Sequence, residues 1–274
     1  MSLVTTDWVL ENLNSLKIID ASWHMPAQKR NPAEEYLNAH IPNSVFFDLD
    51  KNSEKDTDLP HMLPKQEAWE KIMSSLGINN NDDILIYDNS DLKSSCRCWF
   101  SLIYFGHDEK KIHILNGGLK KWIFENKPIT KDATEIIESN YVANEKENLV
   151  VSFDQIKKNI LSKSFNVIDA RSLERFEGKV SEPRKGLRSG HIQNSFCLPF
   201  NLCINQKTGE FKNLEELREL FNQNENIEKR LDPVFTCGSG VTAAVLAYAY
   251  KMVNNDYIPK IYDGSWSEYG KYPA

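Results

Sequence analysis

The sequence Pro233-Val-Phe-Thr-Cys-Gly-Ser-Gly-Val-Thr-Ala-Ala-Val-Leu-Ala-Tyr-Ala-Tyr-Lys251 changes character twice along its length. It begins with a short apolar run, passes through small residues, and continues with alanines and large apolar residues at helical spacing. A strand that leads through a tight turn into a helix is typical of an open α/β sheet, in which ligands bind at the carboxyl ends of the strands. This stretch therefore predicts the fold class and the edge of the sheet where a site would lie.

The turn carries a cysteine at the point where the strand should end. Cys237 is followed by Gly238, Ser239 and Gly240, and two glycines let the backbone curl so that its N–H groups point inward toward an anion. The positive end of the following helix dipole adds to this field. A thiol held there should be partly ionised, and the thiolate is the nucleophile. We predict a reactive cysteine; the alternative is a cysteine packed under a helix, which would not need the glycines.

The composition excludes several classes of protein. The 274 residues carry a net charge of -6, which gives no reason to expect nucleic acid or an anionic membrane as partner. No apolar run approaches the roughly 20 residues of a transmembrane helix, and the first residues do not form a secretory signal. The five cysteines form neither a disulfide framework nor a zinc pattern. We expect a cytoplasmic protein without metal or cofactor.

Four sequence blocks recur in the same order at a period of roughly 150 residues. A period this long indicates duplicated domains. Only the second copy has the cysteine, because Asp88 stands at the position that matches Cys237. The first copy is therefore expected to be catalytically silent. The matched blocks are 18–21 (IIDA) with 167–170 (VIDA), 40–44 (HIPNS) with 191–195 (HIQNS), 84–88 (ILIYD) with 233–237 (PVFTC), and 115–118 (LNGG) with 262–265 (YDGS).

Each half alternates strand-like and helix-like segments, which predicts a mainly parallel sheet flanked by helices. We predict one domain over residues 1–126, a polar linker over 127–148 and a catalytic domain over 149–274. The expected strands are 17–20, 45–47, 84–87 and 112–115 in the first half, and 167–169, 195–198, 234–236 and 261–262 in the second.

The loop 237–242 (CGSGVT) resembles the active-site signature of the two-domain rhodanese family of sulfurtransferases, in the branch that uses 3-mercaptopyruvate. Supporting motifs are 61–64 (HMLP), 116–119 (NGGL), 182–184 (EPR) and 262–266 (YDGSW). The resemblance covers almost the whole chain. It implies an α/β fold with two tandem rhodanese-like domains, of which the first is silent.

The resemblance also implies a reaction. Cys237 would take sulfur from 3-mercaptopyruvate, a small-molecule donor, and release pyruvate. The persulfide on Cys237 would pass to cyanide or to a thiol acceptor, with thioredoxin as one candidate. The loop residues Gly238, Gly240, Val241 and Thr242 would surround the transferred sulfur, since inward N–H groups stabilise a persulfide anion.

Four further residues receive roles from the resemblance. Arg175 and Arg184 would bind the donor carboxylate, because a guanidinium binds a carboxylate in a two-pronged geometry. Ser239 would belong to a proton relay, although it could equally be a turn residue. His40 would approach Ser239, although His191 at the equivalent position favours a structural histidine. The family pairs its histidine with an acid about eleven positions earlier, where Lys29 stands before His40.

Other functions remain as alternatives. A phosphatase or arsenate reductase loop would need an arginine at the position of Ala243. A thiosulfate sulfurtransferase usually has basic residues beside its cysteine, where this chain has neutral ones. A non-catalytic persulfide carrier would not need the arginine pair. The remaining cysteines are expected to pack in the interior: Cys96, Cys98, Cys197 and Cys203.

Overall fold

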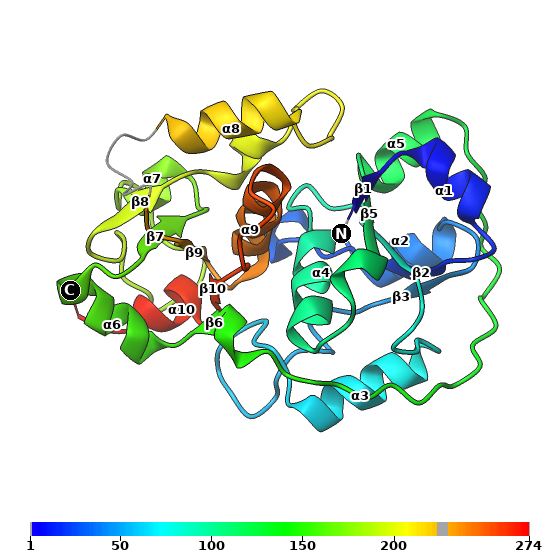
Figure 1. Ribbon diagram of the computed structural model, residues 1–274, viewed down its shortest axis with the longest axis horizontal. Coiled ribbons are helices and arrows are strands. Elements are labelled where there is room, and N and C mark those ends of the chain that lie inside the picture. Colours follow the sequence, from blue (N-terminus) through cyan, green and yellow to red (C-terminus); the bar gives the residue numbers. More distant parts are fainter. Residues whose placement is uncertain (1, 224–229, 274) are drawn as a thin grey trace. The chain divides into compact units, whose positions relative to one another are not determined.

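The computed structural model describes residues 2–223 and 230–273 and divides into two compact units (Figure 1). The first unit comprises Met1–Ser53, Pro64–Lys146 and Gln206–Glu210. The second comprises Glu54–Leu63, Glu147–Asn205 and Phe211–Ala274. Each unit contains one five-stranded parallel sheet with helices around it. The predicted α/β class with two tandem domains is therefore confirmed.

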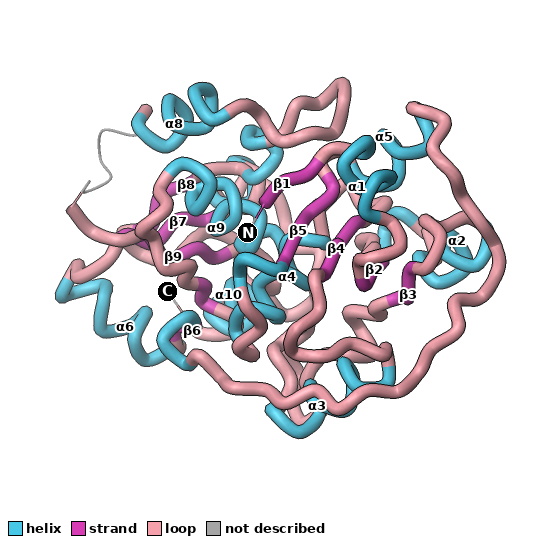
Figure 2. Tube along the Cα trace, turned by 45° about the vertical axis from the view of Figure 1, so that its right-hand side comes forward, coloured by secondary structure: helices cyan, strands magenta, loops and turns pink. Residues whose placement is uncertain are grey.

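The first sheet has the strand order β1-β5-β4-β2-β3, which can be followed in Figure 2. All of its pairs are parallel, with Ile18 opposite Leu85 between the two central strands. Predicted and observed bounds agree for three strands, and β3 begins one residue earlier than expected. The strands are β1 Ser2–Val4, β2 Lys17–Asp20, β3 Ser44–Phe46, β4 Ile84–Tyr87 and β5 Ile112–Leu115.

Helices cover both faces of the first sheet. Residues of α1 and α5, such as Val9 and Trp122, share a buried cluster with Ile18 and Leu85 of the sheet. In Figure 1, α3 lies on the other side of this sheet from α1 and α5. The side chain of Thr5 accepts the N–H of Trp8 and so caps α1. The helices are α1 Thr6–Asn12, α2 Pro32–Asn38, α3 Gln66–Ser75, α4 Ser95–Tyr104 and α5 Gly118–Phe124.

The segment expected to be a linker packs along the first unit as far as Lys146. The backbones of His40 and Thr130 exchange two hydrogen bonds, of 3.0 and 2.9 Å. Farther along, the Thr134 hydroxyl donates to the Ser44 carbonyl at 2.6 Å, and Tyr141 is buried. Although this segment is polar, hydrogen bonds hold it against the rest of the first unit. We call residues 127–146 the strap.

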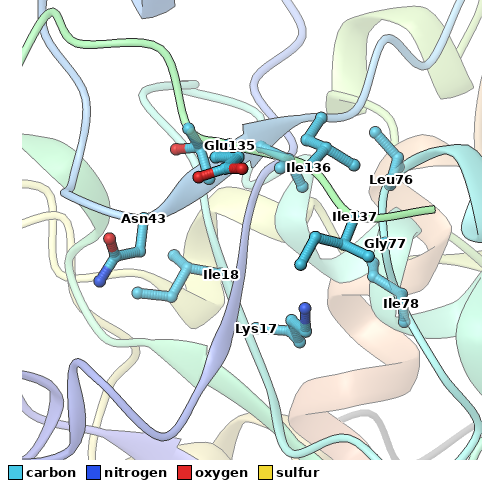
Figure 3. A pocket seen from close by; sticks show the side chains of 11 residues that line it. Lys17, Ile18, Asn43, Leu76, Gly77, Ile78, Glu135, Ile136 and Ile137 are labelled. Carbon is cyan, nitrogen blue, oxygen red and sulfur yellow. The ribbon is translucent and has the colours of Figure 1, made fainter. Parts of the chain in front are cut away.

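The same strap closes a small cavity of about 40 Å³ (Figure 3). Its walls are the start of β2, Asn43 and Val45 at β3, residues 76–78 directly after α3, and residues 134–137 of the strap. Ile18 and Ile137 lie on opposite sides of it. A space of this size has room for about one to three water molecules.

The second sheet repeats the first, with strand order β6-β10-β9-β7-β8 and parallel pairs throughout. Strand by strand this is the same connectivity, as the duplicated sequence blocks predict. The short strands β1 and β6 at one edge of each sheet were not predicted, because two or three residues carry too little pattern. The strands are β6 Val150–Val151, β7 Asn166–Asp169, β8 Ser195–Cys197, β9 Pro233–Thr236 and β10 Ile261–Tyr262.

Helices also cover both faces of the second sheet. Ile156 of α6 and Trp266 of α10 pack with Val167 and Val234 in one buried cluster. On the other side, the α8 residue Phe221 packs edge-on against Phe235 of β9. The longest helix is α9, and none of the described helices is long and apolar enough to cross a membrane. The helices are α6 Phe153–Ser162, α7 Leu173–Phe176, α8 Leu214–Asn222, α9 Val241–Val253 and α10 Ser265–Tyr269.

Asp20 and Asp169 end equivalent strands but have different partners. Asp169 pairs with the Arg171 guanidinium, with Oδ2 and Nη2 2.7 Å apart. The first unit has Ser22 instead, whose N–H donates to Asp20 Oδ1 at 2.9 Å. Burial without a cation raises the pKa of Asp20 to about 6, although hydrogen bonds from Ser22 oppose the rise. Ionisation of Asp20 at neutral pH is therefore less favourable in the folded protein than in the unfolded chain.

We expect the contribution of Asp20 to the free energy of unfolding to fall as the pH rises from about 4 to about 6. In this window the unfolded Asp20 carboxyl has lost its proton and the folded one has not, which favours unfolding by up to about 3 kcal/mol. Asp20→Asn keeps an acceptor for the Ser22 N–H and removes the ionisation. Denaturant titrations between pH 4 and 8 should show the variant gaining stability over wild type as the pH rises. A pH-independent difference would contradict the assignment.

Candidate active site

Cys237 lies in the turn between β9 and α9, at the carboxyl edge of the second sheet. Its side chain is buried, with the residue 2% exposed. Gly240 adopts a left-handed conformation with φ 78° directly before Val241 begins the helix. A residue with a Cβ is strained in that conformation, which explains the second glycine of the loop. The predicted strand–turn–helix arrangement is confirmed.

The start of α10 holds this loop in place. The N–H groups of Cys237 and Gly240 both donate to the Ser265 hydroxyl oxygen at 3.2 Å. Backbone bonds join Trp266 N–H to the Cys237 carbonyl and Ser267 N–H to the Gly238 carbonyl, both at 2.9 Å. Two of the inward N–H groups are therefore already used by the protein.

The remaining donors of the loop are the N–H groups of Gly238 and Ser239. Neither makes a hydrogen bond to any part of the chain that the structure describes. Together with the first N–H groups of α9, they are the donors left for an anion at Cys237. Ser265 was not singled out from the sequence, because its role depends on a contact with a loop 25 or more residues away.

Arg175 and Arg184 converge on Gly238. A Cβ atom on Gly238 would lie 3.3 Å from Arg175 Nη2 and 3.6 Å from Arg184 Nη1. Glycine at this position lets both guanidinium groups approach the backbone beside the nucleophile. Arg184 Nη2 also donates to the Ser239 hydroxyl oxygen at 3.3 Å. The structure thus brings together the cysteine loop and both arginines that the sequence analysis assigned to the donor carboxylate.

A histidine contacts Ser239, and it is His61. Its Nδ1 lies 2.9 Å from Ser239 Oγ, and the residue is 5% exposed. His61 belongs to the short segment Glu54–Leu63, which groups with the second unit although it precedes most of the first in sequence. Leu63 N–H anchors this segment by donating to Asp263 Oδ2 at 2.9 Å.

His40 has a different environment from the one expected. Its Nδ1 lies 2.6 Å from the Tyr36 carbonyl and its Nε2 3.1 Å from the Asp132 carbonyl, and the ring stacks on Tyr36. In the second unit, His191 repeats the arrangement, with Nδ1 2.8 Å from the Phe176 carbonyl and the ring stacked on Phe176. The interpretation of His40 as the partner of Ser239 is therefore replaced by a structural role that both copies keep.

The sequence contained a signal that identifies the correct histidine. The family's acid lies about eleven positions before its histidine, and eleven positions before His61 stands Asp50. Applied to His40, the same rule leads to Lys29, which has no carboxylate. Asp50 is held by the Trp23 indole N–H, at 3.0 Å from each carboxylate oxygen. The HMLP motif and this spacing together point to His61.

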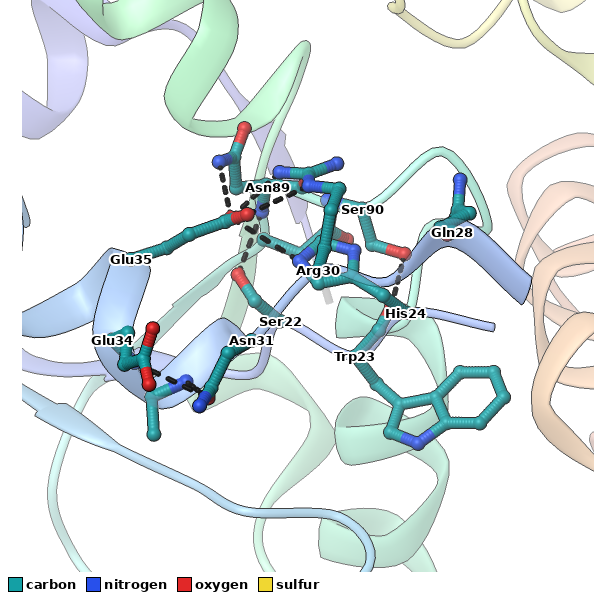
Figure 4. A network of polar contacts seen from close by, with 12 residues as sticks. Ser22, Trp23, His24, Gln28, Arg30, Asn31, Glu34, Glu35, Asn89 and Ser90 are labelled. Atoms are coloured by element: carbon teal, nitrogen blue, oxygen red, sulfur yellow. Dashed lines mark hydrogen bonds and ion pairs between the residues drawn. The ribbon is translucent and has the colours of Figure 1, made fainter. Parts of the chain in front are cut away.

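Asp88 occupies the strand end equivalent to Cys237. Its carboxylate accepts the N–H of Ser90 at 3.1 Å and the N–H of Ser95 at 2.9 Å, and the residue is buried. The loop N–H groups of the first unit thus bind a built-in anion. Nearby, Arg30 pairs with Glu35, and Asn89 and His24 contact the same carboxylate (Figure 4).

Three of the other cysteines lie in environments that oppose ionisation. Burial raises the pKa of Cys203 to about 12, and burial with the nearby Asp169 charge raises that of Cys197 to about 12. Burial also raises the pKa of Cys98 far above its ordinary value. All five cysteines are free thiols. No group of three or more His, Cys, Asp or Glu side chains among the described residues could hold a metal ion.

Comparisons with known proteins give a consistent result. The family profile described as Rhodanese-like domain matches residues 5–125 and 152–272. The 3-mercaptopyruvate sulfurtransferase of Escherichia coli is 37% identical over 97% of this chain and 94% of its own. The thiosulfate/3-mercaptopyruvate sulfurtransferase 1 of Arabidopsis thaliana, a mitochondrial protein, is 39% identical over 99% of this chain and 76% of its own. The crystal structure of SseA from Escherichia coli has a TM-score of 0.86 at 35% identity, covering 97% of this chain and 99% of that one.

His61 and His40 should respond differently to substitution. His61→Ala should lower kcat by about 100-fold with little change in thermal stability, because a proton-transfer partner of Ser239 is lost. His40→Ala should lower the melting temperature while leaving turnover per folded molecule unchanged. Steady-state kinetics and thermal unfolding of both variants provide the test. The reverse pattern would return the catalytic role to His40.

Asp88→Ala tests whether the first loop is silent. The loss of its two N–H contacts should destabilise the protein by about 1–2 kcal/mol, as for a lost helix cap. The kcat and KM of the folded fraction should stay within about twofold of wild type. A loss of about 100-fold or more with an unchanged circular dichroism spectrum would assign an acid–base role to Asp88.

Proposed function

Because this chain belongs to the rhodanese-like family of sulfurtransferases, we propose that it moves sulfane sulfur from 3-mercaptopyruvate through a persulfide on Cys237 to a thiol or cyanide acceptor, releasing pyruvate. One observation carries the choice of donor. Arg175 and Arg184 converge on Gly238, one residue from the nucleophile. A donor that joins a carboxylate to a nearby sulfur can occupy both groups at once.

The transfer begins with the Cys237 thiolate attacking the sulfur of the donor. A new S–S bond forms and the C–S bond of mercaptopyruvate breaks. The electron pair of the C–S bond goes to the carbon, which becomes the enolate of pyruvate and takes up one proton. The N–H groups of Gly238 and Ser239 face the sulfur in this proposal and stabilise the negative charge of the persulfide without reorganising.

Ser239 and His61 are positioned to handle the proton. Arg184 donates to Ser239 Oγ, so the serine hydroxyl can point its own hydrogen toward His61 Nδ1 at 2.9 Å. The pair can accept the proton of the donor thiol and deliver it to the enolate carbon. Val241 and Thr242 lie in the first turn of α9, directly after the loop. At this place they contribute to the positive end of the helix dipole that faces the transferred sulfur.

Two alternatives have weaker support. Thiosulfate as the preferred donor would suit basic residues beside Cys237, and the loop has Gly238 and Ser239 there. Two Arabidopsis thaliana relatives carry both thiosulfate and 3-mercaptopyruvate in their names. The specific form of this alternative is therefore an enzyme that uses both donors. A non-catalytic persulfide carrier has no need of two arginines at one glycine.

For the acceptor, we propose a protein or small-molecule thiol, with thioredoxin as one candidate. A second thiolate must reach the outer sulfur of the persulfide, so a mobile or exposed thiol meets the chemical requirement. We propose a cytoplasmic location, supported by five thiols without a disulfide. A mitochondrial relative makes the organelle the competing location.

Donor addition followed by intact-mass measurement tests the proposed function. Wild type incubated with 3-mercaptopyruvate should gain one sulfur and release one pyruvate per chain. Cys237→Ser should do neither, because its hydroxyl cannot form the persulfide. Cys203→Ser is the matched control and should react like wild type, since its thiol is buried with a raised pKa. A sulfur gain in Cys237→Ser would overturn the assignment of the nucleophile.

A further inference from the structure

We infer that Glu182 is a positioning residue that sets donor selectivity by fixing Arg175 and neutralising its charge. The inference rests on the proposed function, because it concerns the choice between a singly charged and a doubly charged sulfur donor. It starts from a chain of buried ion pairs at the carboxyl edge of the second sheet.

The chain runs from the end of β7 to the arginine beside Gly238. Asp169 holds Arg171 through Nε and Nη2, at distances between 2.7 and 3.1 Å. Arg171 Nη1 lies 2.8 Å from Glu182 Oε1. Glu182 then holds Arg175, with Oε1 at 3.2 Å from Nε and Oε2 at 2.5 Å from Nη2. Each arginine of the chain therefore has its direction set by the carboxylate before it.

This chain is buried up to its last member. The side chains of Asp169 and Arg171 are each 1% exposed, and that of Glu182 is 2% exposed. Arg175 is 22% exposed and forms the open end. The Arg171 guanidinium also lies 4.3 Å from the ring centre of Trp266, whose backbone N–H binds the Cys237 carbonyl. Trp266 therefore contacts both the ion pairs and the loop that carries Cys237.

The geometry leaves Arg175 one face for a donor. Its Nε and Nη2 are used by Glu182, while Nη1 makes no hydrogen bond to the described residues. The Nη2 atom is the one beside Gly238. A carboxylate can therefore approach Arg175 only along the edge formed by Nη1 and Nη2. Without Glu182 the guanidinium could rotate, and this edge would no longer be fixed.

The charges of the four ion-paired side chains cancel. Two carboxylates, Asp169 and Glu182, balance the guanidinium groups of Arg171 and Arg175. The four groups together consequently carry no net charge, and Glu182 offsets the positive charge that Arg175 presents beside Gly238. This suits mercaptopyruvate, which has a single carboxylate, better than thiosulfate, a dianion whose binding gains more from each added positive charge.

Glu182→Gln tests the inference, because glutamine has nearly the same shape and lacks the charge. The ratio of kcat/KM for thiosulfate to kcat/KM for 3-mercaptopyruvate should rise about tenfold or more. The KM for mercaptopyruvate should rise as Arg175 loses its fixed orientation. The change in the ratio should shrink between 20 mM and 500 mM salt, as an electrostatic cause requires.

Two further variants separate charge from structure. Glu182→Asp keeps the charge but shortens the side chain, so activity on both donors should fall while the ratio stays near that of wild type. Glu35→Gln is the matched control in the first unit, where Glu35 holds Arg30 in the same two-pronged way at 2.7 and 2.6 Å (Figure 4). It removes an ion pair without touching the proposed site and should leave the ratio unchanged.

The outcomes distinguish this inference from the proposed function. If wild type does not release pyruvate from mercaptopyruvate, the proposed function fails. If wild type is active but the ratio in Glu182→Gln stays within about twofold of wild type, the inference about Glu182 fails alone. A ratio that shifts equally in Glu35→Gln would also overturn it, since the effect would then follow from lost stability.

Discussion

One backbone contact supports the carboxyl edge of each sheet. In the second unit, Trp266 N–H donates to the Cys237 carbonyl at 2.9 Å, and in the first, Leu119 N–H donates to the Asp88 carbonyl at 2.9 Å. Both contacts follow a residue with positive φ, Ser265 at 50° and Gly118 at 61°. In both units the loop after the central strand is held by the second residue of a helix, α10 or α5, whose first residue has a left-handed backbone. Gly118 has no room for a side chain, since a Cβ would lie 2.3 Å from the Asp88 carbonyl oxygen.

The two copies use this common support for opposite purposes. In the first unit the loop surrounds the Asp88 carboxylate, an anion that belongs to the chain itself. In the second unit a thiol takes its position, and the Gly238 and Ser239 N–H groups stay available. A covalently attached carboxylate satisfies the first loop permanently, whereas a thiol satisfies its loop only when it carries charge. The same turn therefore holds a fixed carboxylate in the first unit and a thiol in the second.

A second difference lies one strand away. Arg171 pairs with Asp169, so the buried acid of the second unit has a cation beside it, while Asp20 in the first unit has only hydrogen bonds. The added arginine lets the ion-pair chain extend through Glu182 to Arg175. In the first unit the ion pair of Arg30 and Glu35 binds Asn89 instead, where Arg30 Nη2 donates to the Asn89 carbonyl at 3.1 Å. The ion pairs that reach Arg175 therefore pass through Arg171, two residues after β7, where the first unit has Ser22.

Local pattern in the sequence determined the duplicated α/β fold and the turn at Cys237, because strand, turn and helix signals all lie within a few residues of one another. The two arginines followed from the resemblance to the rhodanese family. Tertiary structure alone decided the partners. The edge strands β1 and β6 form because the neighbouring strands β5 and β10 pair with them. Ser265 contacts the N–H of Cys237 although the two residues are 28 positions apart in the sequence. The HMLP motif and the spacing to Asp50 already pointed to His61, and folding completed its contact, since a segment of the first half packs into the second unit and brings His61 to Ser239 across 178 residues. Sequence records which groups are available, but a hydrogen bond between distant segments forms only where folding brings the donor and the acceptor within about 3 Å.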